Sequence, residues 1–275
     1  MKKKIMIVFL MLFVFLCFNK NFSVAQENVE IASKPDTIVK IIKPFVERDI
    51  SLHVVDMPAA GLLDKMNYSI GGKLINNGGF VLDFTASLFS FASFGISYGG
   101  DGVIGNEKMN MQRRPGFHIK GKLLSEKEVL PAISVGFNSQ GRGRYLHDKD
   151  RFEQLSVGFY AVGSKTIDWA IGAAGVHAGI NYSVEDANNR GINIYAGAEQ
   201  SILNIAKIVL EINPNLNDSD SDIWKNSKSF MLNGAIKFFP SENMVIELQL
   251  KDLLRNSNFS TEVGRFFGIY FISKF

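Results

Sequence analysis

The sequence predicts an all-β fold: an antiparallel up-and-down transmembrane β-barrel of about 12 strands, preceded by a signal peptide and a short leader. Three observations lead to it. A secretory-type segment opens the chain, apolar and polar residues alternate with a period of two from Asn67 to the end, and the connections between the alternating stretches are short and long in turn. An apolar content of 46% across 275 residues argues against a bundle of membrane helices.

Residues 1–25 have the order of a secretory signal peptide. Three lysines at positions 2–4 precede fourteen apolar residues, Ile5–Phe18, and Ser23-Val24-Ala25 supplies small residues before the expected cleavage site. The apolar run is shorter than the roughly 20 residues that a membrane-spanning helix needs, so we expect cleavage after Ala25.

Cleavage changes what the composition allows. It removes four lysines and leaves 26 basic against 27 acidic residues, a net charge of −1, and it removes Cys17, the single cysteine. Disulfides, thiol nucleophiles and cysteine-based metal sites are thereby excluded from the mature chain. Without a basic excess we expect no nucleic-acid partner, and no motif points to a cofactor.

Residues 26–66 are mixed in character and contain Pro35, Pro44 and Pro58. This composition predicts a periplasmic leader with little regular structure. Whether the leader fills the barrel as a plug or the lumen is an open pore stays undecided, with a narrow or partly plugged lumen favoured.

Residues 67–275 are predicted to form the barrel. In the stretch that contains Ile208 and Leu210, for example, these apolar residues alternate with Lys207, Val209 and Glu211. A soluble sandwich would show the same period with its apolar face inside, so the period alone does not separate the two folds. Twelve strands are expected at 67–75, 79–88, 91–99, 116–124, 130–138, 152–164, 168–182, 191–200, 203–213, 228–239, 243–253 and 262–275.

The connections favour the barrel. Short ones are expected near Ser90, 125–128, 165–167, 200–203 and 240–242, and long polar ones at 100–115, 139–151, 183–190, 214–227 and 254–261; only the tight turn 76–78 departs from this alternation. Outer-membrane barrels have short periplasmic turns and longer external loops, and an even strand number places both termini in the periplasm.

The last strand carries aromatic residues at regular spacing. Phe271 and the terminal Phe275 share a face with Phe267 and Ile269. A terminal aromatic on an alternating strand resembles the signal that the barrel assembly machinery reads, so this machinery, outer-membrane lipid and lipopolysaccharide are the expected partners.

A membrane barrel points its polar residues inward, toward the lumen. The charged residues expected there are of both signs, so salt bridges that fill the lumen are as plausible as an open pore. They are Lys73, Asp83, Lys120, Lys122, Glu199, Lys207, Glu211, Lys237, Glu247 and Lys251.

Three motifs are weak. Gly100–Gly105 fits G-x-G-x-x-G, but the polar stretch after it does not predict the helix that a dinucleotide site needs. Gly95–Gly99 fits G-x-S-x-G, yet Ser97 lies within an alternating stretch and none of the four histidines makes a recognisable pair with it. Asp218, Asp220 and Asp222 repeat half of a calcium loop whose glycine and final glutamate are missing, so a solvated acidic loop is expected.

The predicted external loops contain basic and aromatic residues that are candidates for contacts with anionic sugars or lipopolysaccharide phosphates. The alternative is ordinary solvated loop charge. These candidates are Arg113, Arg114, Arg142, Arg144 and Tyr145.

Two stretches resemble the YjbH-like outer-membrane proteins associated with exopolysaccharide production. Val55–Leu63 is similar to the phrase that precedes the first barrel strand in that family, and Phe117–Gly141, with Pro131 opening a strand, is similar to a strand–turn–strand unit followed by a glycine-rich loop. The resemblance implies a non-enzymatic barrel of the cell outer membrane that assists export of surface polysaccharide or envelope organisation. The alternatives are a diffusion porin for small solutes and, less favoured, a barrel lipid hydrolase.

Overall fold

The computed structural model describes residues 51–105, 108–169, 172–186, 190–202, 205–225, 230–259 and 262–275. The predicted signal peptide and the leader up to residue 50 lie outside the described residues. The regular secondary structure of the described part consists of strands. None of its segments is a helix long and apolar enough to cross a membrane.

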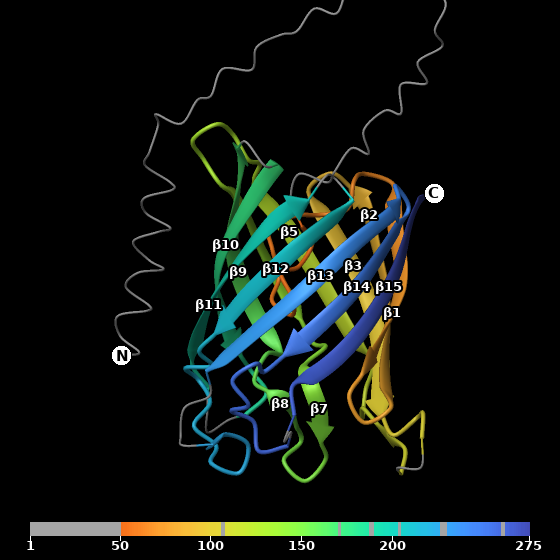
Figure 1. Cartoon of the computed structure of the whole chain (residues 1–275), viewed down its shortest axis with the longest axis vertical. Coiled ribbons are helices and arrows are strands. Elements are labelled where there is room, and N and C mark those ends of the chain that lie inside the picture. Colours follow the sequence, from red (N-terminus) through yellow and green to blue (C-terminus); the bar gives the residue numbers. More distant parts are fainter. Residues whose placement is uncertain are drawn as a thin grey trace, which may run out of the picture.

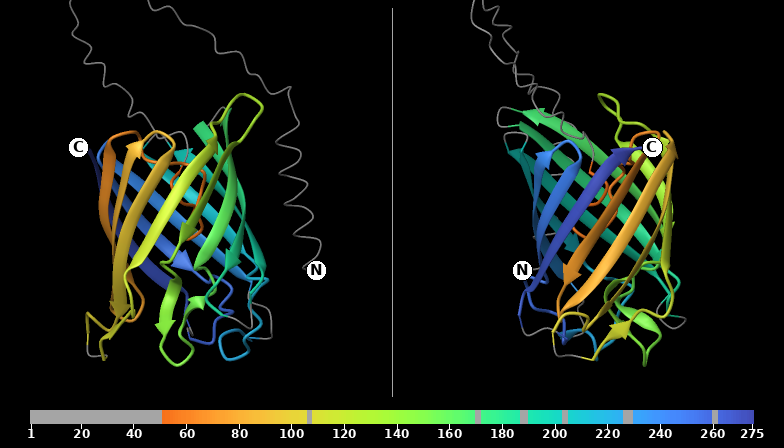
Figure 2. Two further views of the ribbon diagram at one scale, coloured as in Figure 1. Left: turned by 180° about the vertical axis from the view of Figure 1, so that it is seen from behind. Right: turned by 90° about the vertical axis from the view of Figure 1, so that its right-hand side faces the viewer.

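Twelve strands form a closed barrel (Figures 1 and 2). They are β1 Asn67–Ile75, β2 Gly79–Phe89, β3 Ala92–Asp101, β5 Gly116–Leu124, β6 Ala132–Asn138, β9 Gly158–Trp169, β10 Gly172–Ser183, β11 Ile192–Ile202, β12 Ala206–Asn213, β13 Met231–Ser241, β14 Met244–Lys251 and β15 Gly264–Lys274. Three shorter strands, β4 Asn110–Met111, β7 Arg142–Leu146 and β8 Arg151–Gln154, lie in the connections.

Every barrel strand pairs antiparallel with both of its neighbours. The first strand pairs with the last, from Asn67 opposite Lys274 to Leu74 opposite Phe267, and the β2–β3 pairing completes the ring. A closed ring leaves no unpaired strand edge, which is the condition that hydrocarbon imposes on a spanning sheet. The predicted fold class, an antiparallel transmembrane barrel of 12 strands, is confirmed.

Both predicted boundaries of β9 are wrong, and so is the predicted start of β10, at 168 instead of Gly172. The strand expected at 152–164 is β9 at Gly158–Trp169, and the turn expected at 165–167 lies inside it, because Lys165 pairs with Val176 of β10. The polar residues there suggested a turn, but the Lys165 ammonium is paired with Glu126 at 2.9 Å. Phe152 belongs instead to the separate β7–β8 hairpin, where it pairs with Tyr145.

The barrel wall has apolar side chains on its outer face and polar side chains on its inner face, the reverse of the arrangement in a soluble protein. Outward-facing aliphatic residues are exposed, as Ile180 (49%) and Leu210 (48%) are, whereas inward-facing polar residues are buried, as Asn193 (0%) and Glu211 (0%) are. Water on the outside would make this arrangement unfavourable, and lipid makes it favourable, so the exterior is a lipid-facing surface.

Aromatic side chains border this surface at both ends of the barrel. At one end, Phe89 stacks on Phe91 with ring centroids 5.4 Å apart, and Tyr68 contacts Phe275 at 5.0 Å. At the other end, rings at the termini of β5, β6 and β9 (residues 117, 137 and 159) form a continuous row. Aromatic girdles at the two membrane–water interfaces are typical of outer-membrane barrels.

The lipid-facing surface gives a direct prediction. Leu210 lies in the middle of β12 with its side chain outward, so Leu210→Arg is expected to lower the free energy of unfolding by about 2–4 kcal/mol. Denaturant unfolding of the barrel in lipid vesicles measures this. The matched control is Leu216→Arg in the following connection, where the side chain is 63% exposed and the expected change is under ~0.5 kcal/mol. Equal effects of the two variants would contradict the lipid-facing assignment.

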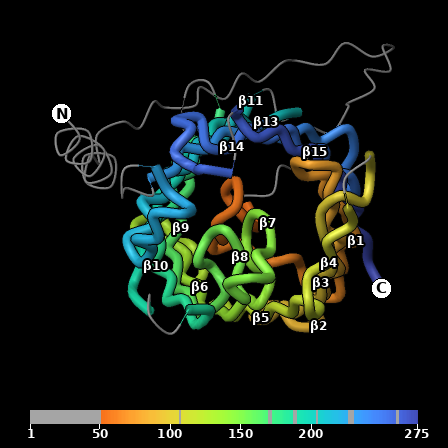
Figure 3. The backbone as a smooth tube through the Cα atoms, turned by 90° about the horizontal axis from the view of Figure 1, so that it is seen from below, coloured from red at the N-terminus to blue at the C-terminus, as the bar shows by residue number. Residues whose placement is uncertain are grey.

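The long connections gather at one end of the barrel, called the loop end, and the short ones at the other, the turn end (Figure 1). Viewed from the loop end, the β7–β8 hairpin lies across part of the barrel opening (Figure 3). The tight turn 76–78 is braced by the glycine-rich connection after β3, since Gly102 donates its N–H to the Asn77 carbonyl at 2.9 Å. Gly102 has a φ of +66°, so this motif serves the loop geometry.

Candidate functional site in the barrel lumen

Residues 51–63, called here the lumen segment, lie inside the barrel (orange in Figures 1–3). The segment is a narrow loop that folds back on itself: Gly61 donates its N–H to Ser51 at 3.3 Å, and His53 forms a bridge with Pro58. Val54 donates its N–H to Met57 at 2.8 Å across the tip of the loop. The entry and exit of the loop are therefore adjacent, and the tip reaches into the lumen.

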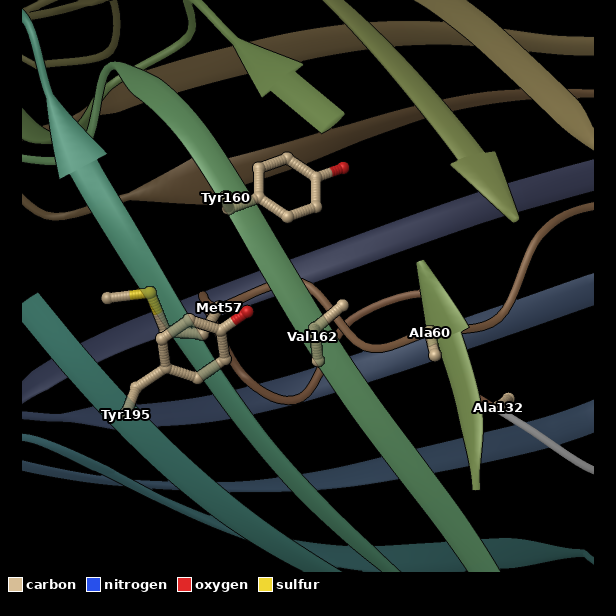
Figure 4. Close-up of a cluster of buried hydrophobic side chains, with 6 residues drawn as sticks. All are labelled: Met57, Ala60, Ala132, Tyr160, Val162 and Tyr195. Atoms are coloured by element: carbon tan, nitrogen blue, oxygen red, sulfur yellow. The ribbon is translucent and has the colours of Figure 1, made fainter. Parts of the chain in front are cut away.

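The apolar side chains of the lumen segment pack on one side of the barrel wall. Met57 and Ala60 cluster with Ala132, Tyr160, Val162 and Tyr195 of β6, β9 and β11 (Figure 4). Val54, Val55 and Ala59 cluster with Val209 and Ala235 of β12 and β13. Gly197 permits this close approach, because a Cβ at that position would lie 2.3 Å from Val54 Cγ1.

Charged wall residues bind the backbone of the lumen segment. Glu211 Oε2 accepts three successive N–H groups, those of Val55, Asp56 and Met57, at 2.8–2.9 Å. On the opposite wall, the Lys120 ammonium donates to three carbonyls of residues 52, 59 and 61 at 2.8–3.0 Å. Hydrogen bonds to charged groups are stronger than neutral ones, so these two side chains are the main polar anchors of the segment.

Other inward-facing wall residues complete the attachment. Tyr195 donates its hydroxyl proton to the Pro58 carbonyl at 3.0 Å, and the Lys237 ammonium donates to the His53 carbonyl at 2.6 Å. The Ser51 hydroxyl donates to Glu199 at 2.5 Å, and Glu199 is itself paired with Lys207 at 3.0 Å. The buried charges of the wall are thus neutralised by each other and by the backbone of the lumen segment.

A cavity of about 330 Å³ remains between the lumen segment and the wall formed by β1, β2, β3 and β5. Its lining includes Ser93 and Asp101, which lie near opposite ends of β3, so it extends along the length of the lumen. Charged residues of both signs line it, among them Lys73, Asp83 and Arg142.

Asp56, at the tip of the lumen segment, lies close to three cationic side chains. Its Oδ1 is paired with the Lys251 ammonium, and Lys73 lies at 3.7 Å. Burial alone would raise the pKa of Asp56, but the charges of Lys251, Lys73 and Arg142 lower it to about 2. Asp56 is therefore ionised at neutral pH and holds the tip among three cations.

The lowered pKa predicts a pH dependence. A carboxylate with a pKa of 3.8 unfolded and about 2 folded stabilises the seated tip by about 2 kcal/mol above pH ~4, and this contribution is lost as the pH falls toward 2. Amide hydrogen exchange of residues 51–63, corrected for intrinsic rates, is expected to accelerate over this range.

Asp56→Asn provides the control. This variant is expected to exchange faster already at pH 6 and to show no further acceleration from this group. An identical pH profile for the variant and the wild-type protein would contradict the role given to Asp56.

The structure places nine of the ten predicted lumen residues in direct contact with other groups inside the barrel. Four of them line the cavity beside the lumen segment: Lys73, Asp83, Lys120 and Lys251. Asp83 lies 3.8 Å from His118. Glu199, Lys207, Glu211, Lys237 and Glu247 are buried. Lys122 lies on the same face of β5 as Lys120, is half-buried, and makes no contact of this kind with a described residue.

The five external-loop candidates separate into two groups. Arg142 and Arg144 line the cavity at its loop end, where the Arg142 Nε donates to the Asp56 carbonyl at 2.7 Å and Arg144 lies 3.5 Å from Asp101. Arg113 and Tyr145 both bind Asp150, at 2.8 and 2.5 Å, on the outer surface. Arg114 is exposed beside them. The first group is thus placed for contact with a solute in the lumen and the second for contact outside it.

The acidic connection before β13 is not simply solvated. Asp218 is buried and paired with Arg151 at 2.5 Å, and Lys149 pairs with Asp220 at 2.6 Å and with Asp222 at 2.8 Å. The calcium-loop interpretation has no geometric support, because no group of three or more His, Cys, Asp or Glu in the described ranges is placed to hold a metal ion. These pairs tie the β7–β8 hairpin to a neighbouring loop.

Ser97, the residue of the G-x-S-x-G motif, lies inward in β3. Its hydroxyl donates to Gln140 Oε1 at 2.9 Å and not to a base. His118, the histidine on the adjacent strand β5, is joined to Thr85 at 2.9 Å and lies near Asp83. The serine and the histidine therefore belong to separate hydrogen-bond pairs, an arrangement that does not activate Ser97.

Sequence reasoning missed Asp56, His53 and the buried Arg151. In the sequence alone, Val55-Asp56-Met57-Pro58 resembles a family signature and gives no sign that it forms a tip that binds the barrel wall. An available signal was that two apolar residues before Asp56 and seven apolar or small residues after it leave it the only charge between His53 and Asp64, which is unusual for a solvated leader.

Known proteins resemble this chain in fold. No family model matches the sequence, and no curated protein matches it. A solved structure of the KdgM porin superposes with a TM-score of 0.50 at 9% identity, covering 74% of this chain and 98% of the porin. The Acinetobacter baumannii outer membrane protein Omp33 gives 0.44 at 11% identity, covering 77% and 99%.

The expected resemblance to YjbH-like proteins is wrong. No family model supports it, and a solved structure that shares the fold is that of the KdgM porin. The two stretches have local structural roles instead: Val55–Leu63 is part of the lumen segment, and Phe117–Gly141 is the β5–β6 hairpin with the start of the next loop. The chain is therefore similar in fold to the KdgM porin, with a closed antiparallel barrel of twelve strands.

Proposed function

We propose that this protein is a narrow, non-enzymatic diffusion channel of the outer membrane, in which the lumen segment acts as a plug that leaves a passage along β1, β2, β3 and β5. The observation that carries the proposal is the cavity of about 330 Å³ that follows β3 and is lined by charged side chains of both signs. Small polar solutes are the class that such a passage admits.

The proposal accounts for how the wall is built. The apolar contacts of the lumen segment are with β6, β9, β11, β12 and β13, so the segment is held against one side and the cavity lies on the other. Lys120 and Glu211, the two polar anchors, bind backbone atoms, so the segment is held firmly whatever passes beside it.

Planar-bilayer recording tests the proposal. The purified full chain is expected to give small, steady single-channel steps, because the lumen segment occupies much of the barrel. Lys73→Glu, on the cavity wall, is expected to shift the reversal potential in a KCl gradient toward cation selectivity. Lys127→Glu, in an exposed turn-end connection, is the control and should leave it unchanged. A folded protein that produces no steps would overturn the proposal.

We place the turn end in the periplasm and the loop end outside the cell, with outer-membrane lipid and lipopolysaccharide as the surroundings. Short turns on the periplasmic side and long external loops support this orientation, as does the even number of strands. Phe271 and Phe275 are outward-facing and exposed at the end of β15, which supports their proposed reading by the barrel assembly machinery.

The alternative functions have less support. Export of surface polysaccharide rested on the YjbH resemblance, which the comparisons contradict, so a polysaccharide partner is not carried forward. Lipid hydrolysis would need an activated serine at the lipid-facing rim, whereas Ser97 is buried in the lumen wall and bonded to Gln140.

A further inference from the structure

The tip of the lumen segment and the wall around it leave hydrogen-bonding capacity that the protein itself does not use. The Asp56 side chain is only 5% exposed, and its Oδ2 atom accepts no hydrogen bond from the described residues. Buried acceptors of this kind are rare, because an unsatisfied polar atom costs free energy. The atom belongs to a residue that lines the cavity.

Two cations beside Asp56 also have unused donors. The Lys73 ammonium lies 3.7 Å from Asp56 Oδ1, beyond hydrogen-bond distance, and donates to no described residue. The Arg142 Nε is used by the Asp56 carbonyl, and its two terminal nitrogens donate to no group in the described part of the chain. Both residues line the cavity.

The side chains around the tip of the lumen segment carry a net positive charge. Lys73, Arg142 and Lys251 surround one carboxylate, and only Lys251 is directly paired with it. The nearby carboxylates are engaged elsewhere: Glu211 binds backbone N–H groups of the lumen segment, and Glu247 binds His53 at 2.8 Å and Gln249 at 2.7 Å. An anion is therefore the complementary ligand.

We propose that Lys73, Arg142 and Asp56 form a binding site for a small hydroxycarboxylate. The ligand carboxylate binds the Lys73 ammonium and the Arg142 terminal nitrogens, and its hydroxyl donates to Asp56 Oδ2. The hydroxyl also separates the ligand carboxylate from the Asp56 carboxylate, which a simple anion would not do. The cavity volume is roughly ten times the ~30 Å³ that a water molecule occupies in the liquid, so a ligand of lactate size fits.

The proposal rests on the proposed function only in taking the cavity as the solute passage, and it is tested without measuring current. Ligand-observed saturation-transfer NMR on the folded full chain in detergent compares L-lactate with propionate, which lacks the hydroxyl. Lactate is expected to bind about tenfold more tightly than propionate, the effect of one hydrogen bond to a charged acceptor. Equal affinities would overturn the proposal.

Three variants assign the contacts. Lys73→Gln is expected to weaken both ligands by about tenfold, since it removes a cation from the carboxylate site. Asp56→Ala is expected to bring the lactate-to-propionate ratio to about one whatever happens to the separate affinities. Lys127→Gln, outside the cavity, should change neither. A ratio that persists in Asp56→Ala, or unchanged binding in Lys73→Gln, would contradict the site. Lactate binding by a protein that conducts no ions would refute the channel and leave this site standing.

Discussion

Replacing Glu211 with alanine is expected to release the tip of the lumen segment and to raise the single-channel conductance several-fold. Glu211 Oε2 accepts the N–H groups of three consecutive residues, 55, 56 and 57. Each hydrogen bond to a charged group contributes about 1.5–3 kcal/mol, so the variant loses several kcal/mol of tip stabilisation while the lipid-facing surface is untouched. Glu211→Gln keeps a hydrogen-bond acceptor but not the charge, so its conductance should lie between those of the wild type and of Glu211→Ala.

Two comparisons make this result specific. Glu242→Ala removes an exposed carboxylate at the turn end and should leave the conductance unchanged. Gly197→Val pushes on Val54 from β11, the strand beside Glu211, because even a Cβ at position 197 would lie 2.3 Å from it. With Glu211 retained, the tip is displaced toward the cavity, so the conductance should fall without any change of charge. Unchanged conductance in a Glu211→Ala protein that keeps the heat-modifiable gel mobility of a folded barrel would show that this contact does not limit the width of the passage.

The second large effect is expected at the loop end. Arg151→Ala should cost about 3–5 kcal/mol of loop stability, because the buried Asp218 carboxylate would lose the Arg151 guanidinium that offsets its charge. Arg151 also donates to the carbonyls of Phe152 and Glu153, at 3.0 and 3.2 Å, so its loss frees the β7–β8 hairpin. Proteinase K added to folded protein is expected to cut within 139–157 much faster than in the wild type.

The neighbouring ion pair supplies the control. Lys149 pairs with Asp220 and Asp222 at a partly exposed position, where such pairs contribute about 0–1 kcal/mol, so Lys149→Ala should leave the cleavage rate nearly unchanged. Replacing both Arg151 and Asp218 with apolar residues of similar size should restore much of the protection, because no charge is left buried. If the double replacement were as sensitive as Arg151→Ala, the loss of packing rather than the buried charge of Asp218 would explain the effect.

The barrel was predictable because apolar and polar residues alternate along its strands with a period of two. Ile208 and Leu210 face lipid and Lys207 and Glu211 face inward, and this pattern is written directly in the order of the residues. The prediction failed where the alternation was locally weak. In β9, outward-facing Lys165 is stabilised by Glu126, which lies 39 positions earlier in the chain, so no short window of sequence indicates that a strand continues there.

The lumen segment could not be located from the sequence for a related reason. It has no periodic pattern, and what holds it are single contacts with distant residues: Val55 with Glu211, 156 positions away, and Gln249 with Val55, 194 positions away. The inward charges were predictable as a set, but their partners were not, because the backbone groups that Lys120 and Glu211 bind belong to a segment outside the alternating region. The position of Arg142 inside the lumen could not be predicted for the same reason, because its partner is the Asp56 carbonyl of the lumen segment.

The position of the lumen segment in the chain has a consequence for how the barrel is made. The segment immediately precedes β1, and β1 forms one side of the seam with β15, the last strand to be synthesised. Its anchors lie on β5, β11, β12 and β13, so it can bind all of them while the seam is still open. We therefore expect the lumen segment to be seated before the later strands close around it. Variants that weaken its contacts should consequently slow seam closure as well as widen the finished pore.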